Sequence, residues 1–248
     1  MVISHRHRYL YFVTPKCASA TVRTSLCDLT DLGYPVTKGL PQHQTIAQFL
    51  AGPYASLFDA GYFRFTFVRN PYDRLYSGYA QDRVVAGRNP KWQKVKEPIF
   101  REIGDDFNRY VSEHVRYARR LDDWEWICFW PMHAFAFVDG ECMLDWIGRA
   151  ESVETDLATL SAKLGVEIVK AEDRNVHTPP SAGPKYIDRY DRATIEIVND
   201  LYREDFQRFG YQLLDPGLLP VLGPARSEPA PVPAGASTGM NVGKSATG

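Results

Sequence analysis

The stretch YFRFTFVRNPYDRLYSGY, residues 62–79, contains the clearest fold signal in the chain. Its first seven residues, 62–68, are rich in aromatic and β-branched side chains, which favour a β-strand. A helix start follows at once, because Asn70 is a good N-cap, Pro71 suits the first helical position, and Asp73 places a carboxylate at the positive helix end. The stretch therefore predicts a strand that leads directly into a helix.

An earlier part of the chain repeats this order. Residues 9–13 form a compact apolar run that ends at Thr14 and Pro15, which indicates a buried strand followed by a turn. Across residues 18–29 the apolar positions recur at spacings of four, four and three, which predicts a helix with one buried stripe. The chain thus has two expected units of strand, loop and helix.

The alternation continues toward the C-terminal part, where Gly165 and Gly210 each mark the end of a helical stretch. Four further elements are expected: a strand at 134–138, a helix at 154–164, a strand at 166–169 and a helix at 194–209. Strands that alternate with helices predict an α/β fold with a central, mainly parallel sheet.

Length and composition limit the organisation and the kind of ligand. The 248 residues are 44% apolar and 24% charged, which fits one globular domain, placed at residues 1–214. Residues 215–248 are rich in Pro, Ala, Gly and Ser and predict a disordered tail. Because 29 Lys and Arg balance 30 Asp and Glu, no nucleic-acid partner is expected, and an anionic ligand needs a local site.

Cysteine usage and hydropathy predict the compartment. The four cysteines are too few and too irregularly spaced for a disulfide framework, and none forms a C-x-x-C pair. No apolar run approaches the roughly 18 residues that cross a membrane. We therefore expect a cytoplasmic protein without a membrane span.

The loop TPKCASAT, residues 14–21, lies between the first expected strand and its helix. Backbone N–H groups at a helix start point outward without partners, and small side chains let an oxyanion approach them. The loop lacks the G-x-x-x-x-G-K-[ST] pattern, so an ordinary ATP-hydrolysing P-loop is not indicated. An anion-binding loop and an ordinary strand-to-helix turn are equally open at this point.

In the second unit of strand and helix, residues 62–79, an arginine lies where the strand ends. Arg69 ends the strand, and Ser77 lies eight residues later, about two helical turns along. An arginine can hold a phosphate through two parallel hydrogen bonds, and a serine can add a third. Two such loops in one domain indicate a ligand with phosphates at both ends.

These loops resemble those of sulfotransferases that use 3′-phosphoadenosine-5′-phosphosulfate (PAPS), in the branch of the Golgi carbohydrate sulfotransferases and their bacterial relatives. Residues 15–21 resemble the family's 5′-phosphosulfate loop, and residues 65–79 resemble its 3′-phosphate motif. Residues 147–151 and 201–211 are also similar, so the resemblance covers nearly all of the expected domain. The proline-rich stretch 175–186 departs from the family pattern.

The resemblance implies a P-loop-like, nucleotide-kinase-like fold of three layers and a reaction that moves a sulfuryl group from PAPS to a hydroxyl group. The acceptor would be a carbohydrate or another small molecule, and 3′,5′-ADP would be released. Lys16 would stabilise charge on the leaving phosphate oxygen, and no metal is expected. The implied donor-binding residues are Lys16, Cys17, Ala18, Ser19, Ala20, Thr21, Arg69 and Ser77.

His43 is the expected general base for the acceptor hydroxyl. It lies between the two loops in the sequence and resembles a histidine that many family members carry before the 3′-phosphate motif. A positioned base contributes roughly 10²–10⁴ in rate. The alternative is that His43 only caps or precedes a helix that runs to Leu50.

Two other functions stay open. An ATP-dependent small-molecule kinase would require magnesium, and a non-catalytic nucleotide-binding module would bind the donor without turnover. A bacterial-type enzyme is favoured over a Golgi enzyme that has lost its anchor. The sequence does not assign an oligomeric state or roles for Arg149, Glu151 and Lys185.

Two stretches in the middle of the chain also have alternatives. Five basic residues between positions 88 and 101 predict either a solvated loop or a surface that attracts an anionic acceptor. Residues 124–130, WEWICFW, predict either core packing or a sugar-stacking platform.

Overall fold

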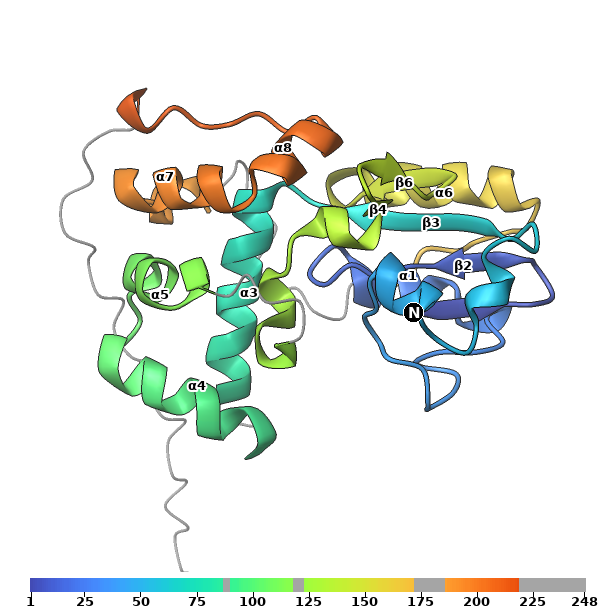
Figure 1. Ribbon diagram of the computed structural model, residues 1–248, viewed down its shortest axis with the longest axis horizontal. Coiled ribbons are helices and arrows are strands. Elements are labelled where there is room, and N and C mark those ends of the chain that lie inside the picture. The colour runs from blue at the N-terminus through green and yellow to red at the C-terminus, as the bar shows by residue number, and fades with distance from the viewer. Residues whose placement is uncertain (87–89, 118–122, 172–185, 219–248) are drawn as a thin grey trace, which may run out of the picture.

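The computed structural model describes residues 1–86, 90–117, 123–171 and 186–218. Figure 1 shows a mixed α/β architecture in two halves, which we call the sheet half (described residues of 1–70 and 132–171) and the helical half (described residues of 71–131 and 186–218). The helices are α1 Ser19–Ser25, α2 Ile46–Leu50, α3 Pro71–Ala86, α4 Pro90–Ile103, α5 Phe107–Glu113, α6 Val153–Leu164, α7 Arg192–Leu201 and α8 Arg203–Phe209.

The central sheet contains four strands in the order β1, β2, β3, β6. Strand β1 is antiparallel to β2, whereas β2, β3 and β6 are parallel to one another. The carboxyl ends of these three strands therefore meet at one edge, as expected for a mainly parallel sheet. A separate hairpin joins β4 and β5. The strands are β1 Val2–Ser4, β2 Tyr9–Tyr11, β3 Phe63–Val68, β4 Phe137–Val138, β5 Glu141–Cys142 and β6 Trp146–Arg149.

Side chains alternate across the central sheet and build a core on each face. On one face Tyr11 stacks on Phe65 with ring centroids 4.9 Å apart, and residues of α1 and α6 complete this core. On the other face Phe12 packs against Phe49 of α2. Burial of each large apolar side chain stabilises the fold by roughly 1.5–3 kcal/mol. The sheet thus has helices on both faces.

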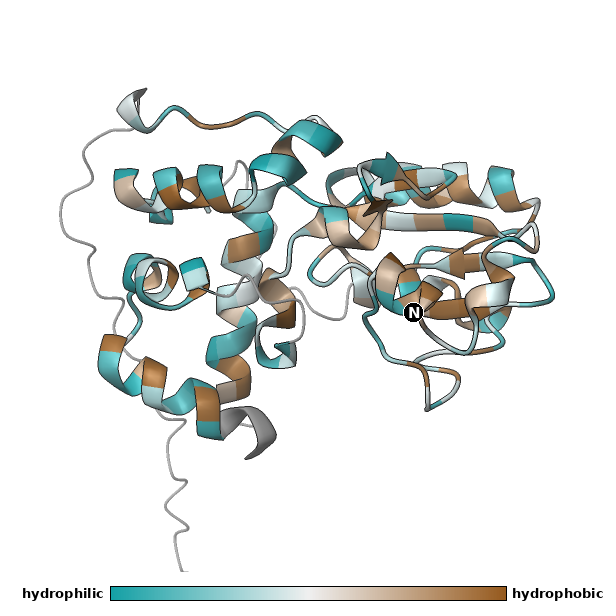
Figure 2. Ribbon diagram, in the orientation of Figure 1, coloured by the Kyte–Doolittle hydropathy of each residue, from teal (hydrophilic) through white to brown (hydrophobic). Residues whose placement is uncertain are grey.

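The helical half encloses an aromatic core between α3, α4, α5, α7 and α8 (Figure 1). Its rings meet at steep angles, as in the contacts of Phe107 with Tyr79 at 5.2 Å and with Tyr190 at 4.8 Å between ring centroids. In Figure 2 the helices of this half carry both apolar and polar segments, which fits helices with one buried face.

The basic stretch from 88 to 101 forms helix α4 in its described part, so the expectation of a solvated loop is wrong. Lys96 is fully buried, with Nζ 2.9 Å from Oδ2 of Asp82 and 3.2 Å from the ring centroid of Trp126. Trp126 therefore packs in the core of the helical half, which agrees with the core-packing alternative for residues 124–130.

The strand and helix predicted for residues 62–79 are confirmed. Strand β3 is followed directly by α3, and the Asn70 side chain caps the helix by accepting a hydrogen bond from the Tyr72 N–H at 3.0 Å. The helix predicted at 154–164 is also confirmed as α6. Gly165 ends it in the left-handed conformation, with φ of 65°.

Two predicted helices are interrupted. The helix expected across 18–29 ends as α1 and continues as a 3₁₀ turn at Cys27–Leu29. The helix expected across 194–209 is divided into α7 and α8, because Tyr202 leaves helical geometry with φ of −113°. The Tyr202 hydroxyl donates to the carbonyl of Phe129 at 2.8 Å, so a tertiary contact accompanies the break.

Two strand expectations need correction, and two observed strands were not expected. The strand expected at 134–138 is a 3₁₀ turn followed by the short β4, and residues 166–169 form no strand. Strand β6 was not expected, because it is short and contains Gly148. A Cβ atom at Gly148 would lie 2.7 Å from the Phe67 ring, so close packing against β3 explains the glycine. The edge strand β1 was not expected either.

The described chain continues slightly into the expected tail. Residues Pro216–Leu218 form a 3₁₀ turn, and the Pro216 carbonyl accepts a hydrogen bond from Arg192 at 3.1 Å. Residues 219–248 and residues 172–185, which include Lys185, lie outside the described residues. No helix within the described residues is long and apolar enough to cross a membrane.

Candidate functional site

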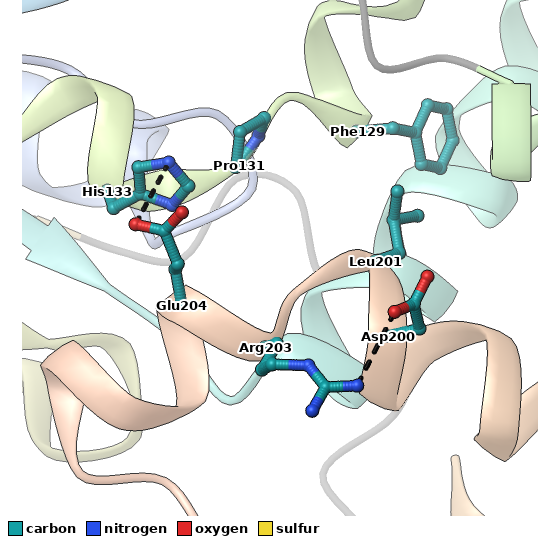
Figure 3. Close-up of a pocket in the computed structure, with 7 residues that line it drawn as sticks. All are labelled: Phe129, Pro131, His133, Asp200, Leu201, Arg203 and Glu204. Carbon is teal, nitrogen blue, oxygen red and sulfur yellow. Dashed lines mark hydrogen bonds and ion pairs between the residues drawn. The ribbon is translucent and has the colours of Figure 1, made fainter.

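A hollow of about 310 Å³ lies between residues 129–133 and the junction of α7 and α8 (Figure 3). Phe129, Pro131 and His133 line it, whereas Trp130 and Met132 are fully buried and contact the site described next. None of the predicted donor-binding residues lines this hollow, nor does His43; Phe129 is the one lining residue that comes from the stretch 124–130. Segment 129–133 therefore separates it from the predicted site.

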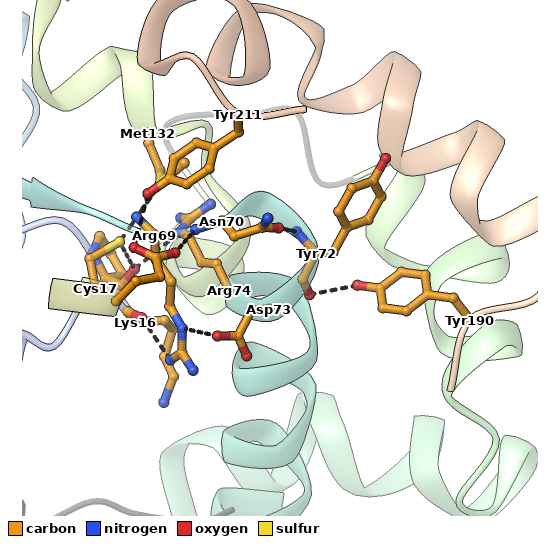
Figure 4. A network of polar contacts seen from close by, with 12 residues as sticks. Lys16, Cys17, Arg69, Asn70, Tyr72, Asp73, Arg74, Met132, Tyr190 and Tyr211 are labelled. Carbon is orange, nitrogen blue, oxygen red and sulfur yellow. Dashed lines mark hydrogen bonds and ion pairs between the residues drawn. The ribbon is translucent and has the colours of Figure 1, made fainter. Parts of the chain in front are cut away.

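Three of the predicted residues, Lys16, Cys17 and Arg69, lie together instead at the carboxyl edge of the central sheet (Figure 4). Strand β2 leads into loop 14–21, β3 ends just before Arg69, and β6 is followed by Glu151. Ligand sites of open α/β sheets lie at this edge, because strand ends and helix N-termini meet there. The Nη1 of Arg69 donates to the carbonyl of Lys16 at 3.3 Å, so the two predicted loops are in contact.

Loop 14–21 has an unusual backbone that turns directly into α1. Lys16 and Ala18 both adopt the left-handed conformation, with φ of 64° and 53°. Cys17 between them is fully buried, and burial raises the pKa of its thiol to about 12. Its Sγ lies 3.5 Å from the Pro15 carbonyl oxygen and 3.7 Å from the Met132 Sδ. Cys17 is therefore a neutral packing residue beneath the loop.

Arg69 is held by its own helix but keeps one terminal nitrogen available. Its Nε donates to the Asp73 carboxylate at 2.7 Å, and its backbone N–H points to the Met132 Sδ at 3.5 Å. Among the described residues, Nη2 of Arg69 has no hydrogen-bond partner. Arg69 thus reaches the Lys16 loop in a fixed orientation with donor capacity left for a ligand.

Arg74, one helical turn further on, lies behind the loop and is only 1% exposed. Its Nε donates to the carbonyl of Pro15 at 3.1 Å, and its Nη2 donates to the carbonyl of Trp130 at 2.5 Å. The guanidinium carbon lies 5.9 Å from the ring centroid of Tyr202 in the helical half. Arg74 therefore connects the loop, α3 and the wall formed by segment 129–133.

Charge pairing distinguishes this site from the rest of the described protein. Six lysines and arginines in the described part are buried or half-buried. Three of them form ion pairs with carboxylates: Arg64 with Asp145, Arg69 with Asp73, and Lys96 with Asp82. The other three, Lys16, Arg23 and Arg74, have no carboxylate partner among the described residues. All three lie on or against the segment that runs from the end of β2 into α1.

Lys16 shows the electrostatic consequence most clearly. Burial lowers the pKa of its ammonium group below the ordinary value for lysine, and the positive charge of Arg69 lowers it further. No hydrogen bond or ion pair of its Nζ is present within the described chain. An anion bound at the loop would satisfy this donor and favour its charged form.

His43 lies beside the same loop, at the end of β2. Its Nδ1 is 2.8 Å from the Val13 carbonyl oxygen, so Nδ1 carries the proton and donates, and Nε2 of the neutral ring is free of a proton. Burial lowers the pKa of His43 to about 3, with the nearby Arg23 charge as a further cause. Helix α2, which runs to Leu50, is capped by Thr45, whose side chain accepts a hydrogen bond from the Gln48 N–H. His43 is therefore not the N-cap of this helix.

The remaining predicted residues are placed with fewer contacts. Ala18, Ser19 and Ala20 are half-buried at the start of α1, and Thr21 is mostly buried at 7% exposure. Ser77 is half-buried on α3, and within the described chain it has no hydrogen bond to Arg69 or to loop 14–21. The geometry therefore joins loop 14–21, Arg69 and His43, but it does not join Ser77 to them.

Glu151 acquires a defined position that the sequence left open. Its Oε1 accepts from the Asn70 N–H at 2.5 Å, and its Oε2 accepts from the Tyr211 hydroxyl at 3.1 Å. The side chain of Arg149 points to the same ring, with its guanidinium carbon 4.7 Å from the Tyr211 centroid. These contacts tie the end of β6 to the start of α3 and to the chain after α8.

The comparisons with known proteins concern the chain as a whole and not its individual site residues. A model of the sulfotransferase family matches residues 1–212. The chain belongs to the sulfotransferase family. Carbohydrate sulfotransferase 10 of Xenopus laevis is 23% identical over 240 residues, which cover 85% of this chain and 66% of that relative. The match thus extends over slightly less than two thirds of the relative's length. No solved structure matches the chain.

Sequence reasoning missed two residues of this sulfotransferase-family site. Arg74 and Met132 are separated by 58 positions, and each contacts loop 14–21. Arg74 occupies the buried face of α3 with Leu75 and Gly78, and a charged residue at such a position is an available sequence signal. Met132 gives no comparable signal. In the described chain no group of His, Cys, Asp or Glu side chains could hold a metal ion.

Proposed function

We propose that this chain is a PAPS-dependent sulfotransferase with a P-loop-like fold, which transfers the sulfuryl group to a hydroxyl of a carbohydrate acceptor and releases 3′,5′-ADP. The observation that carries the proposal is the group of three non-exposed cations without carboxylate partners, Lys16, Arg23 and Arg74, around one strand-to-helix loop. Buried charges are costly unless they are paired. An anionic ligand at loop 14–21 supplies that pairing, and family membership supports sulfuryl transfer.

The residues at the sheet edge fit a ligand with anionic groups at two ends. Lys16 and the backbone N–H groups at the start of α1 would hold the 5′-phosphosulfate, and Arg69 with Ser77 would hold the 3′-phosphate. When bound, PAPS would supply the sulfuryl group and 3′,5′-ADP as the leaving group. Lys16 would stabilise the negative charge that grows on the leaving phosphate oxygen as the S–O bond breaks.

His43 is suited to remove the acceptor proton. Because Nδ1 donates to Val13, the lone pair of Nε2 is available to accept the hydroxyl proton as the new O–S bond forms. The low pKa keeps the ring neutral in the absence of ligand. A bound phosphosulfate would raise the pKa of His43, because a nearby negative charge favours the imidazolium form.

The acceptor class and the compartment are also part of the proposal. A carbohydrate acceptor follows the printed name of the relative, carbohydrate sulfotransferase 10. All four cysteines are free thiols, which fits the reducing conditions of a cytoplasmic location.

Titration calorimetry of the purified chain tests the donor site. We expect 3′,5′-ADP to bind at micromolar or lower concentration and at least about tenfold more tightly than 5′-AMP, because the second phosphate adds charge-assisted hydrogen bonds. Turnover of PAPS with a panel of oligosaccharides would then identify the acceptor. Equal binding of both nucleotides, or a preference for ATP with magnesium, would contradict the proposal.

A further inference from the structure

Arg74 is the most deeply buried of the cations without a carboxylate partner. The residue is 1% exposed, and within the described chain its guanidinium donates to the backbone carbonyls of Pro15 and Trp130 and lies against the neutral Tyr202 side chain. Carbonyl oxygens satisfy donors but do not neutralise a full positive charge. The position of Arg74 therefore carries an electrostatic cost that the described residues around it do not offset by ion pairing.

The buried carboxylate in this part of the molecule is engaged elsewhere. Asp205 is fully buried and accepts from the backbone N–H groups of Met132 and His133, each at 2.8 Å. The Nδ1 of His133 also lies 2.9 Å from Asp205. Asp205 thus fixes segment 129–133, which in turn presents the Trp130 carbonyl to Arg74.

The hydrogen bond to Pro15 connects this charge to the predicted 5′ loop. Pro15 directly precedes Lys16, whose left-handed backbone begins the turn into α1. Holding the Pro15 carbonyl toward α3 directs that carbonyl dipole away from the face where an anion would bind. The same contact places the guanidinium charge behind Lys16 and Cys17 (Figure 4).

We propose that Arg74 is a positioning residue for the 5′ end of the donor: it fixes loop 14–21 from behind, and its buried charge is compensated when the anionic 5′ group binds. This inference rests on the proposed function. It assigns different roles to two arginines of one motif. Arg69 is paired with Asp73 and reaches outward to the ligand, whereas Arg74 is unpaired and acts through the loop.

Truncated nucleotides separate these roles. Arg74→Met keeps an unbranched apolar stem but removes the charge and the donors of both hydrogen bonds. We expect it to weaken the binding of 5′-AMP and of 3′,5′-ADP by about tenfold or more, because a charge and its hydrogen bonds are lost at the 5′ loop. Binding of 3′-AMP, which lacks the 5′ group, should change less than about threefold, because its contacts do not involve that loop.

Two further variants control for simple loss of folding. Arg64→Met removes a half-buried arginine at the amino end of β3, where its bonds to Asp145 are remote from the loop, so nucleotide affinities should stay unchanged. Arg74→Lys keeps a positive charge but cannot reproduce the guanidinium fork, and we expect affinity for 5′-AMP between wild type and Arg74→Met. If Arg74→Met fails to fold, the Arg74→Lys variant still tests the inference.

Each outcome has a distinct meaning. Equal losses for 5′-AMP and 3′-AMP in a folded Arg74 variant, or no loss for either, would overturn the positioning role. Wild-type protein that does not prefer 3′,5′-ADP over 5′-AMP would instead remove the proposed function, whatever the Arg74 variants do. A loss confined to ligands with a 5′ group supports the inference.

Discussion

Lys96 in the helical half is buried and Lys16 in the sheet half is half-buried, and their surroundings are opposite. Lys96 is fully buried and has an aspartate at 2.9 Å, the Tyr110 hydroxyl at 3.4 Å and the Trp126 ring beneath it. Lys16 has no ion pair within the described chain and lies on a left-handed backbone at a sheet edge. Lys96 is thus paired within the fold, whereas Lys16 lies unpaired within the described chain at the edge where we propose that the donor binds.

The same contrast extends to the two halves as wholes. In the helical half, aromatic side chains pack against one another and the buried charge of Lys96 is paired with Asp82. The sheet half ends at an edge where cations, a neutral histidine and a helix start converge. We therefore expect substitutions at the sheet edge to change ligand binding or turnover, and substitutions of the buried pair to change stability.

The largest expected effect is on turnover. His43→Gln removes the free Nε2 acceptor, so kcat with PAPS should fall by roughly 10²–10⁴ while the affinity for 3′,5′-ADP stays nearly constant. Steady-state kinetics and calorimetry measure the two quantities. His5→Gln, at the opposite end of β2, is the matched control and should behave as wild type. Unchanged kcat in His43→Gln would exclude His43 from the mechanism.

The second largest expected effect is on stability, and it tests the buried Asp82–Lys96 ion pair. Asp82→Ala leaves the buried Lys96 ammonium without its carboxylate, so the free energy of unfolding should fall by about 3–5 kcal/mol in urea titrations. The double variant Asp82→Leu with Lys96→Met removes both charges and should recover most of this loss. A small effect of Asp82→Ala would show that the pair is not structurally important.

Donor affinity should be the third largest effect. Arg69→Ala removes the guanidinium that lies against the Lys16 carbonyl and leaves Asp73 unpaired. Because a hydrogen bond to a charged group contributes about 1.5–3 kcal/mol, binding of 3′,5′-ADP should weaken roughly 10- to 150-fold in calorimetry. Arg64→Ala, which breaks the Arg64–Asp145 pair at the other end of β3, should leave the affinity unchanged.

The smallest expected effect is a pH dependence of stability. The pKa of His43 is lowered to about 3 in the folded protein, whereas an unfolded histidine titrates near its ordinary value of about 6.5. The stabilisation from neutral His43 is thus complete above pH 6.5 and is lost as the pH falls toward 3. Between pH 7 and 4.5 the unfolding free energy of wild type should fall by on the order of 2 kcal/mol more than that of His43→Gln. Parallel losses in both proteins would contradict this assignment.

In both halves the sequence predicted best the elements whose ends carry local signals. Residues 62–79 and 154–164 carry local signals, namely an N-cap, an N1 proline and a C-terminal glycine, and the structure confirms both elements. Helix α4 was missed, because residues 88–101 are dominated by charge and the partner that buries Lys96 lies in another helix. Tyr202 broke a predicted helix for the same reason, since its contact is with Phe129.

The candidate site shows a similar division. Lys16, His43 and Arg69 could be selected because their residue types sit next to expected strand and helix ends, or because they resemble family positions. Their grouping at one sheet edge remains a consequence of parallel strand order. The sequence shows that Arg74 lies within the motif, but it does not show what the side chain contacts. Its two carbonyl partners belong to segments before and after α3.

The sequence by itself determined the alternation of strands and helices, the two loops at strand ends and the family to which the chain belongs, because these depend on local propensity and short motifs. Only the tertiary structure decided which charges are paired. Ion pairing depends on distances between segments remote in the chain, and those distances separate Lys96, whose charge is paired with Asp82, from Lys16 and Arg74, which have no carboxylate partner among the described residues.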